Sequence, residues 1–179
     1  VRDIVNGMSP RRIVVGSLLE HEARDACARH EAEFGDDVCF VPAWGNLFVS
    51  AELAHTSRGQ LLSAKEHRAA LLGAVYGDFE TAYRNNHLVQ MIRHHRPEVI
   101  VDAVNTATGL SYQDVFDGVA KVRSWIGKDG GYDAKGVQDL ESLLLSQTAP
   151  QLIRHVRFVQ EATTRYGTRV YLKVGTTGT

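Results

Sequence analysis

The feature that most constrains the fold is a run of mostly β-branched residues in the middle of the chain, Val99-Ile100-Val101-Asp102-Ala103-Val104. Pro97 lies just before this run, and a small polar turn that extends to Gly109 follows it. A short apolar run between turn signals is typical of a buried parallel strand. Because ligands of open α/β sheets bind beyond the carboxyl ends of the strands, we expect chemistry in this turn. The alternative interpretation is a core strand with an ordinary tight turn.

The rest of the chain alternates strands with helices. Residues 12–17 are predicted to form a strand, residues 19–34 an amphipathic helix, and residues 38–46 a second strand with its exit. A last strand is predicted at residues 169–174, after a helix that Gly167 ends. Such alternation predicts an α/β fold, a Rossmann-like three-layer sandwich with a parallel sheet and right-handed crossovers.

Two connections are longer than this pattern needs, at residues 47–86 and 110–147. Both follow the carboxyl end of a predicted strand, so we interpret them as helical insertions on the ligand face that form a lid or a substrate or partner surface. In the first, Ser63 and Glu66 have the spacing of a capping box, which predicts a helix start there.

The helix after the second insertion has its own start signal, with Thr148 as the expected cap and Gln151 three residues later. Its expected buried stripe consists of residues that recur at helical intervals: Leu152, Val156, Val159 and Ala162 or Thr163.

The composition excludes several classes of protein. A chain of 179 residues that is 44% hydrophobic and 23% charged predicts one soluble domain. Its net charge of -1 argues against nucleic acid as the main partner. The sequence holds no apolar run of membrane-spanning length and no secretory leader, so we expect no membrane partner and a cytoplasmic location. Cys27 and Cys39 lack metal or disulfide spacing, and no metal site is expected at His94 and His95.

The chain contains a helix that ends in His-Arg-Pro-Glu, the strand Val-Ile-Val-Asp with its exit Ala-Val-Asn-Thr-Ala-Thr, and a final strand that ends in Gly-Thr-Thr-Gly-Thr. These residues resemble the middle of a short-chain dehydrogenase/reductase of the extended type, a family with an NAD(P)-binding Rossmann fold. The resemblance spans roughly residues 13–179 and is most specific at residues 97–109. It implies a small-molecule substrate with a carbonyl or hydroxyl group, and it is compatible with a homo-oligomer.

The resemblance also assigns site residues. Asn105, Thr106 and Ala107 match the motif beside the nicotinamide ribose, and Thr108 completes this cofactor wall. Thr176 and Thr177 match a turn that supplies a catalytic hydroxyl. Elsewhere in the chain, the resemblance places Gly16, Ser17, Gly45 and Asn46 at the cofactor.

Three departures from the family pattern are present. The glycine-rich turn that receives the pyrophosphate is absent, and the Tyr-x-x-x-Lys pair would lie after Thr179. Gly16 and Ser17 occupy the positions where NAD enzymes carry an acid that binds the ribose, so the sequence favours NADP over NAD as the cofactor. Since Val1 is no initiator and the chain stops just after a strand, we expect a piece of a longer chain that is not active alone. If the family's first strand is missing from the middle of the sheet, unpaired backbone groups remain on both sides of the gap, so we also expect the piece not to be stable alone.

Two registrations of the strands remain open. In the first, residues 12–17 are the family's second strand, and the first strand would lie between them and residues 99–102. In the second, residues 12–17 pair directly with residues 99–102, which places Gly16 and Ser17 near the phosphates.

Two function classes remain. One is an NAD(P)-dependent oxidoreductase, epimerase or dehydratase, and the other is a non-catalytic NAD(P)-binding sensor or scaffold.

Two further residues have open roles. Asp102 is interpreted as a structural carboxylate or as an acid with a raised pKa, and Tyr112 as a pocket residue or a cap.

Overall fold

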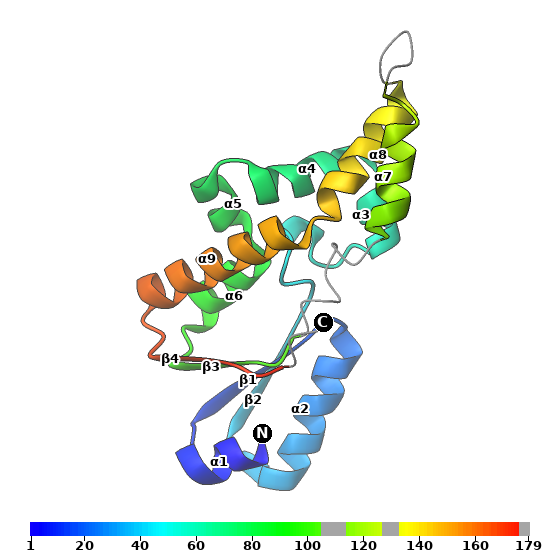
Figure 1. The fold of residues 1–179 in the computed structure, drawn as a ribbon. Coiled ribbons are helices and arrows are strands. Elements are labelled where there is room, and N and C mark those ends of the chain that lie inside the picture. The colour runs from blue at the N-terminus through cyan, green and yellow to red at the C-terminus, as the bar shows by residue number, and fades with distance from the viewer. Residues whose placement is uncertain (105–113, 127–132, 176–179) are drawn as a thin grey trace. The chain divides into compact units, whose positions relative to one another are not determined.

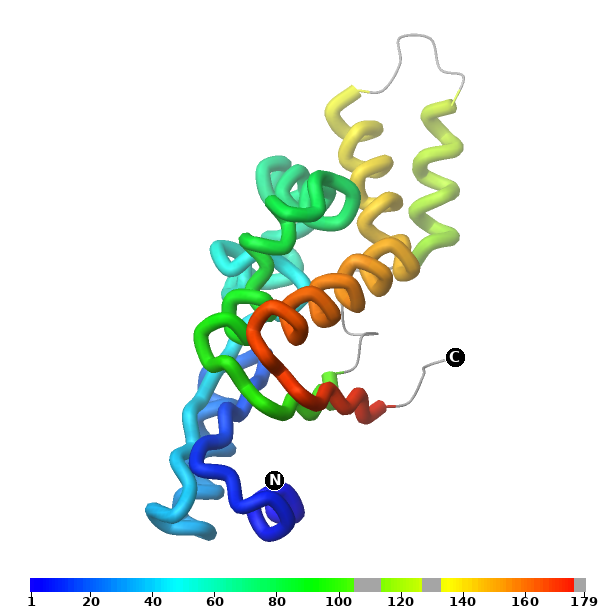
Figure 2. Tube along the Cα trace, turned by 90° about the vertical axis from the view of Figure 1, so that its left-hand side faces the viewer, coloured from blue at the N-terminus to red at the C-terminus, as the bar shows by residue number. Residues whose placement is uncertain are grey.

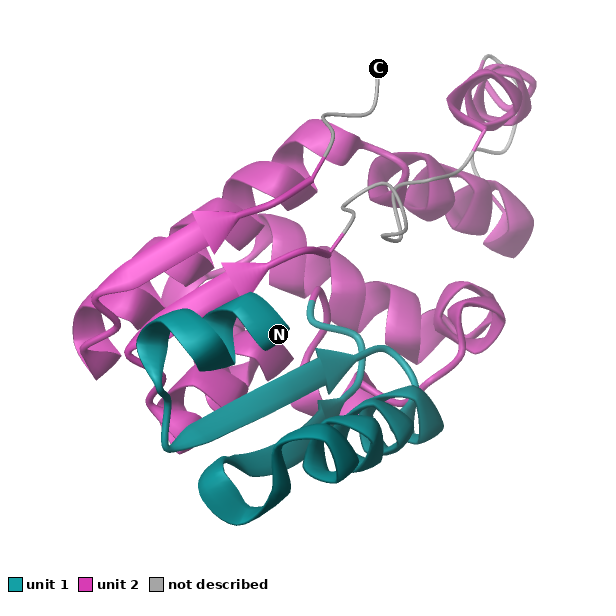
Figure 3. Ribbon diagram, turned by 90° about the horizontal axis from the view of Figure 1, so that it is seen from below, with its two compact units in different colours: residues 1–47 teal, residues 48–179 magenta. Residues whose placement is uncertain are grey.

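The structure is a computed structural model that describes residues 1–104, 114–126 and 133–175. The predicted residues Asn105–Thr108, Tyr112, Thr176 and Thr177 lie outside these ranges. The chain divides into two compact units, residues 1–47 and residues 48–179 (Figure 3). The described part is mostly helical with four short parallel strands, which confirms a mixed α/β composition.

Unit 1 is a strand-helix-strand arrangement (Figure 1). Its elements are α1 (Arg2–Met8), β1 (Arg12–Ser17), α2 (Glu20–Phe34), the 3-10 turn η1 (Gly35–Asp37) and β2 (Cys39–Trp44). The strands β1 and β2 are parallel and in register, from Arg12 opposite Cys39 to Ser17 opposite Trp44. Both strands therefore end at the same edge, as the alternation predicted.

The core of unit 1 forms because α2 presents a narrow apolar stripe to the strands. Ala23 and Cys27 are buried one turn apart on α2, and Cys27 clusters with Val38 and Phe40. Gly35 ends the helix with a φ of 62°, a conformation that favours glycine. The predicted helix and its end are confirmed.

Unit 2 holds most of the helices. Its elements are η2 (Ala51–Leu53), α3 (Arg58–Ser63), α4 (Lys65–Tyr76), α5 (Phe79–Asn85), α6 (His87–His95), β3 (Val99–Asp102), α7 (Val115–Arg123), α8 (Ala134–Leu145), α9 (Thr148–Tyr166) and β4 (Val170–Lys173). The insertion at 47–86 contributes α3 to α5, and the insertion at 110–147 contributes α7 and α8. No helix in the described ranges is long and apolar enough to cross a bilayer.

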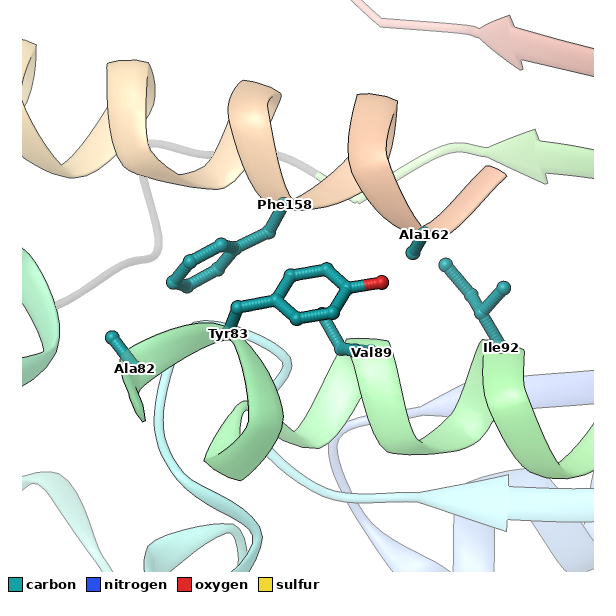
Figure 4. Close-up of a cluster of buried hydrophobic side chains, with 6 residues drawn as sticks. All are labelled: Ala82, Tyr83, Val89, Ile92, Phe158 and Ala162. Atoms are coloured by element: carbon teal, nitrogen blue, oxygen red, sulfur yellow. The ribbon is translucent and has the colours of Figure 1, made fainter. Parts of the chain in front are cut away.

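The main core of unit 2 lies between α5, α6 and α9. Figure 4 shows the aromatic rings of Tyr83 and Phe158 side by side at its centre, with ring centroids 6.0 Å apart. The cluster comprises Ala82, Tyr83, Val89, Ile92, Phe158 and Ala162. Ile100 of β3 packs against it, so α6 and α9 lie on one face of β3 and β4.

The predicted stripe of α9 is partly wrong. Val159 and Ala162 are buried as expected, but Leu152 and Val156 are 43% and 54% exposed. Phe158 and His155 take the inward positions instead, because the face of α9 is set by the aromatic cluster that it joins.

Two predicted helix starts are also wrong in detail. The helix α4 begins after Ala64, without a side-chain cap, and Ser63 is the last residue of α3. The capping box is formed by Ser57 and Gln60, which places Leu61 in the core. At α9 the cap position falls on Gln147, so Thr148 is the first helical residue.

The strands β3 and β4 are parallel, with Val99 opposite Val170 and Asp102 opposite Lys173. Every described strand pairs within its own unit, β1 with β2 and β3 with β4. The pairing of residues 12–17 with residues 99–102, which the second registration requires, concerns the two units together and stays a prediction.

The helices α7 and α8 pack against each other as a hairpin (Figure 2). The hairpin is tied to α4 by an ion pair at 2.7 Å between Arg68 and Glu141, whose side chains are 6% and 17% exposed. Arg68 also donates to the carbonyl oxygens of Leu62 and Ser63. The second insertion is thus part of the packed structure of unit 2.

Candidate functional site

The carboxyl edge of β3 and β4 carries a network of charged and polar side chains. The Asp102 carboxylate accepts hydrogen bonds from the hydroxyl of Tyr171 and from the backbone N–H of Val104, the latter at 2.9 Å. The Lys173 ammonium forms an ion pair with Asp102, at 3.0 Å from Oδ1, and also donates a hydrogen bond to the carbonyl oxygen of Val104. The network follows from the register, because Asp102 and Lys173 are opposite each other on parallel strands.

These contacts set the protonation of the network. Burial alone raises the pKa of Asp102, but the hydrogen bonds from Tyr171, Val104 and Lys173 outweigh it, so the pKa lies below its ordinary value of 3.8. Burial and the bond to Asp102 raise the pKa of Tyr171. Asp102 is therefore a hydrogen-bonded carboxylate, and the alternative interpretation as an acid with a raised pKa is wrong.

His155 of α9 is a second titratable group on the helix side of these strands. It is 8% exposed, and its ring lies 4.8 Å from the ring of Phe48, centroid to centroid. Burial lowers the pKa of His155, while Asp102 acts in the opposite direction and Lys173 in the same direction. The imidazole is thus held neutral near neutral pH, inside the field of the charged network.

The carboxyl edge of β1 and β2 in unit 1 is built mainly from backbone. Gly45 follows β2 with a φ of 126°, a conformation that a residue with a Cβ rarely adopts. Its N–H donates to the carbonyl oxygen of Ser17 at 3.0 Å and so continues the strand pairing by one residue. The predicted site residues Ser17 and Gly45 are therefore brought together at this edge.

Side chains of α2 complete this edge. The hydroxyl of Ser17 donates to the carboxylate of Glu22, and the guanidinium of Arg24 stacks over the ring of Trp44 at 4.9 Å. Arg24 also pairs with Glu20 one turn away, at 2.8 Å. An acid therefore lies next to Ser17, although the sequence showed none at the end of the strand.

The structure thus gives a mixed result for the predicted site residues. It brings Gly16, Ser17 and Gly45 to one edge, with Asn46 next in the chain, whereas Asn105–Thr108, Thr176 and Thr177 lie outside the described residues.

Sequence reasoning missed Glu22, Tyr171, Lys173 and His155. Once the two strands are aligned in parallel register, Lys173 falls opposite Asp102, and this was the signal that could have identified it.

Comparison with known proteins adds no relative: no protein-family model, curated protein or solved structure matches this chain.

Proposed function

We propose that the protein is an NAD(P)-dependent oxidoreductase, epimerase or dehydratase of the short-chain dehydrogenase type, with a small carbonyl or hydroxyl substrate. The observation that carries this proposal is the placement of polar and glycine residues at the carboxyl edges of two in-register parallel strand pairs. Such edges are where open α/β sheets bind their ligands. A complete Rossmann-like sandwich and a role for Thr176 and Thr177 in orienting the substrate oxygen belong to the same proposal.

The residues present at the edge of unit 1 fit a dinucleotide. Gly45 leaves the backbone open to close approach, since no Cβ covers it. Ser17 and Asn46 provide neutral hydrogen-bonding groups beside it, while the residues predicted for the nicotinamide ribose, Asn105–Thr108, lie outside the described residues. A bound NAD(P) supplies hydride transfer, and these residues would hold and orient it.

The choice between NAD and NADP depends on two side chains of α2. Glu22 is a carboxylate that suits a ribose 2′-hydroxyl, whereas Arg24 is a cation that suits a 2′-phosphate. The strand itself ends without an acid, which favours NADP, whereas Glu22 beside Ser17 favours NAD. Glu22→Gln should strengthen NADPH binding relative to NADH if the 2′-phosphate lies at this edge.

The proposal is tested by titrating the purified protein with NADH and NADPH in a calorimeter. We expect saturable binding that weakens about tenfold in Gly45→Ala, the loss expected for roughly 1.4 kcal/mol. Gly35→Ala is the matched control, because Gly35 also has a positive φ but lies at the start of η1, before β2. A wild-type protein that binds neither dinucleotide overturns the proposal.

A non-catalytic NAD(P) sensor or scaffold is the second candidate. It is favoured by the edge of β3 and β4, where the hydroxyl of Tyr171 donates to Asp102 and the Lys173 ammonium pairs with the same carboxylate, so that both groups are engaged in a structural network. Binding without turnover of any carbonyl or hydroxyl substrate would support this candidate, and reading the gene for a Tyr-x-x-x-Lys segment after Thr179 would separate the two.

A further inference from the structure

We infer that a small cavity between α4 and α9 is a binding site for one buried water molecule, which completes the hydrogen bonding of His155. The cavity lies within unit 2, where Ala74 and Val75 line it from α4 and Arg154 and His155 line it from α9. This site is independent of dinucleotide binding, so the inference goes beyond the proposed function.

His155 is a buried polar residue that lines this cavity. It is 8% exposed, and the ring of Phe48 covers it at 4.8 Å between centroids. No hydrogen bond joins its imidazole to another residue in the described ranges. Burial lowers the pKa of His155, so the ring is neutral and has one N–H donor and one acceptor nitrogen. Because buried polar groups without a partner are costly, the imidazole requires one.

The cavity has the size of one water molecule. Its volume is about 20 Å³, and a single water needs about 10–15 Å³ of such space. Cavities with purely apolar walls stay dry, whereas cavities that present several polar groups hold water. A larger ligand would require α4 and α9 to move apart, so water is the ligand that fits.

Two further polar side chains line the cavity beside His155. Gln151 donates from Nε2 to a carbonyl oxygen at the end of α8 at 2.6 Å, and its amide oxygen has no donor among the described residues. Arg154 donates from Nε to the carbonyl oxygen of Val75 at 2.9 Å and from Nη2 to that of Gly77 at 2.8 Å. Nη1 of Arg154 is then left as a donor. A water bound to His155 therefore has the two to four polar partners that buried waters use.

Asn86, a second buried polar residue of the cavity, shows the contrast. It is 4% exposed, and its side chain donates to the carbonyl oxygen of Val49 at 3.3 Å and accepts from the N–H of Val89 at 3.2 Å. Its hydrogen bonds are thus made to the protein, and it is His155 that depends on a bound molecule.

The experiment combines NMR of the wild-type protein with cavity-filling variants. Cross-relaxation between water and the carbon-bound ring hydrogens of His155 detects a long-lived bound water directly, and it requires no variant to fold. Ala74→Val fills the cavity from α4, and it is made in the wild-type protein and in His155→Leu. Ala70→Val is the matched control, because Ala70 is an exposed residue of the same helix.

We expect a water signal at the His155 ring in the wild-type protein and none in Ala74→Val. Ala74→Val should lower the midpoint of thermal unfolding by about 2–4 °C more than Ala70→Val, since it expels the partner of a buried polar group. In the His155→Leu background the two substitutions should have equal effects, because no imidazole is left unpaired there.

A dry cavity predicts the opposite result. Filling an empty cavity gains contacts, so Ala74→Val would then unfold at the same or a higher temperature than Ala70→Val, which overturns the inference. Equal losses from Ala74→Val in the two backgrounds also overturn it, because the strain of overpacking then explains the loss. A wild-type protein without a water signal at the His155 ring overturns it whatever the variants show.

Discussion

The chain is held by different kinds of contact where it leaves the two parallel strand pairs. At the edge of β1 and β2, a backbone hydrogen bond from Gly45 to Ser17 and the positive φ of that glycine shape the exit. At the edge of β3 and β4, side chains of the strands themselves, Asp102 and Lys173, hold the exit. The first edge therefore depends on backbone conformation, and the second depends on charge.

The largest effect is expected from the helix layer behind β3 and β4. Phe158→Ala should lower the free energy of unfolding of unit 2 by about 3–5 kcal/mol, because Phe158 is 3% exposed and packs on Tyr83 and Phe79. Denaturant unfolding with hydrogen exchange measures this loss. Amides of β1 and β2 should keep their protection, since unit 1 has its own core; equal loss in both units would contradict that independence.

A smaller effect is expected from the backbone at the first edge. Gly45→Ala should cost about 1–3 kcal/mol, because alanine is strained at a φ of 126°. Thermal unfolding followed by hydrogen exchange in unit 1 measures it. If Gly45→Ala leaves the stability of unit 1 unchanged, the conformation of Gly45 does not determine how the chain leaves β2. The contrast with the edge of β3 and β4 would then be wrong.

The smallest effect is a dependence on pH that is expected at the edge of β3 and β4. The pKa of Asp102 is lowered on folding, so its contribution to stability is present above the ordinary value of 3.8 and is lost as the pH falls through the folded value. The backbone bond of Gly45 does not titrate. The protection factor of the Val104 amide, the intrinsic exchange rate divided by the observed rate at the same pH, should therefore fall in acid, and Asp102→Asn should remove that fall; a pH response unchanged by this substitution would assign it to another group.

Much of the fold could be predicted from the sequence where the signal is local. The β-branched runs located β1 and β3, and Gly35 and Gly167 marked the ends of α2 and α9. The capping box failed because two serines have suitable partners three residues later, and the burial of Leu61 favours Ser57 over Ser63. Local motifs indicate several possible helix starts, and the packing of nearby side chains determines which of them is used.

The candidate site was predicted less well because its contacts are not local. Asp102 was identified as unusual among valines, but its partner Tyr171 is 69 positions away in the sequence, and Lys173 lies two residues further along. His155 was overlooked because Leu152 and Val156 gave the better apolar periodicity on α9. Only the register of β3 and β4 and the face of α9 bring these groups together.

The most direct test of the central claim is hydrogen exchange on the wild-type protein with and without saturating NADPH or NADH. The account predicts slower exchange at Gly45 and Asn46, at the edge of β1 and β2, when dinucleotide is bound. Exchange that is unchanged there with either dinucleotide would contradict it.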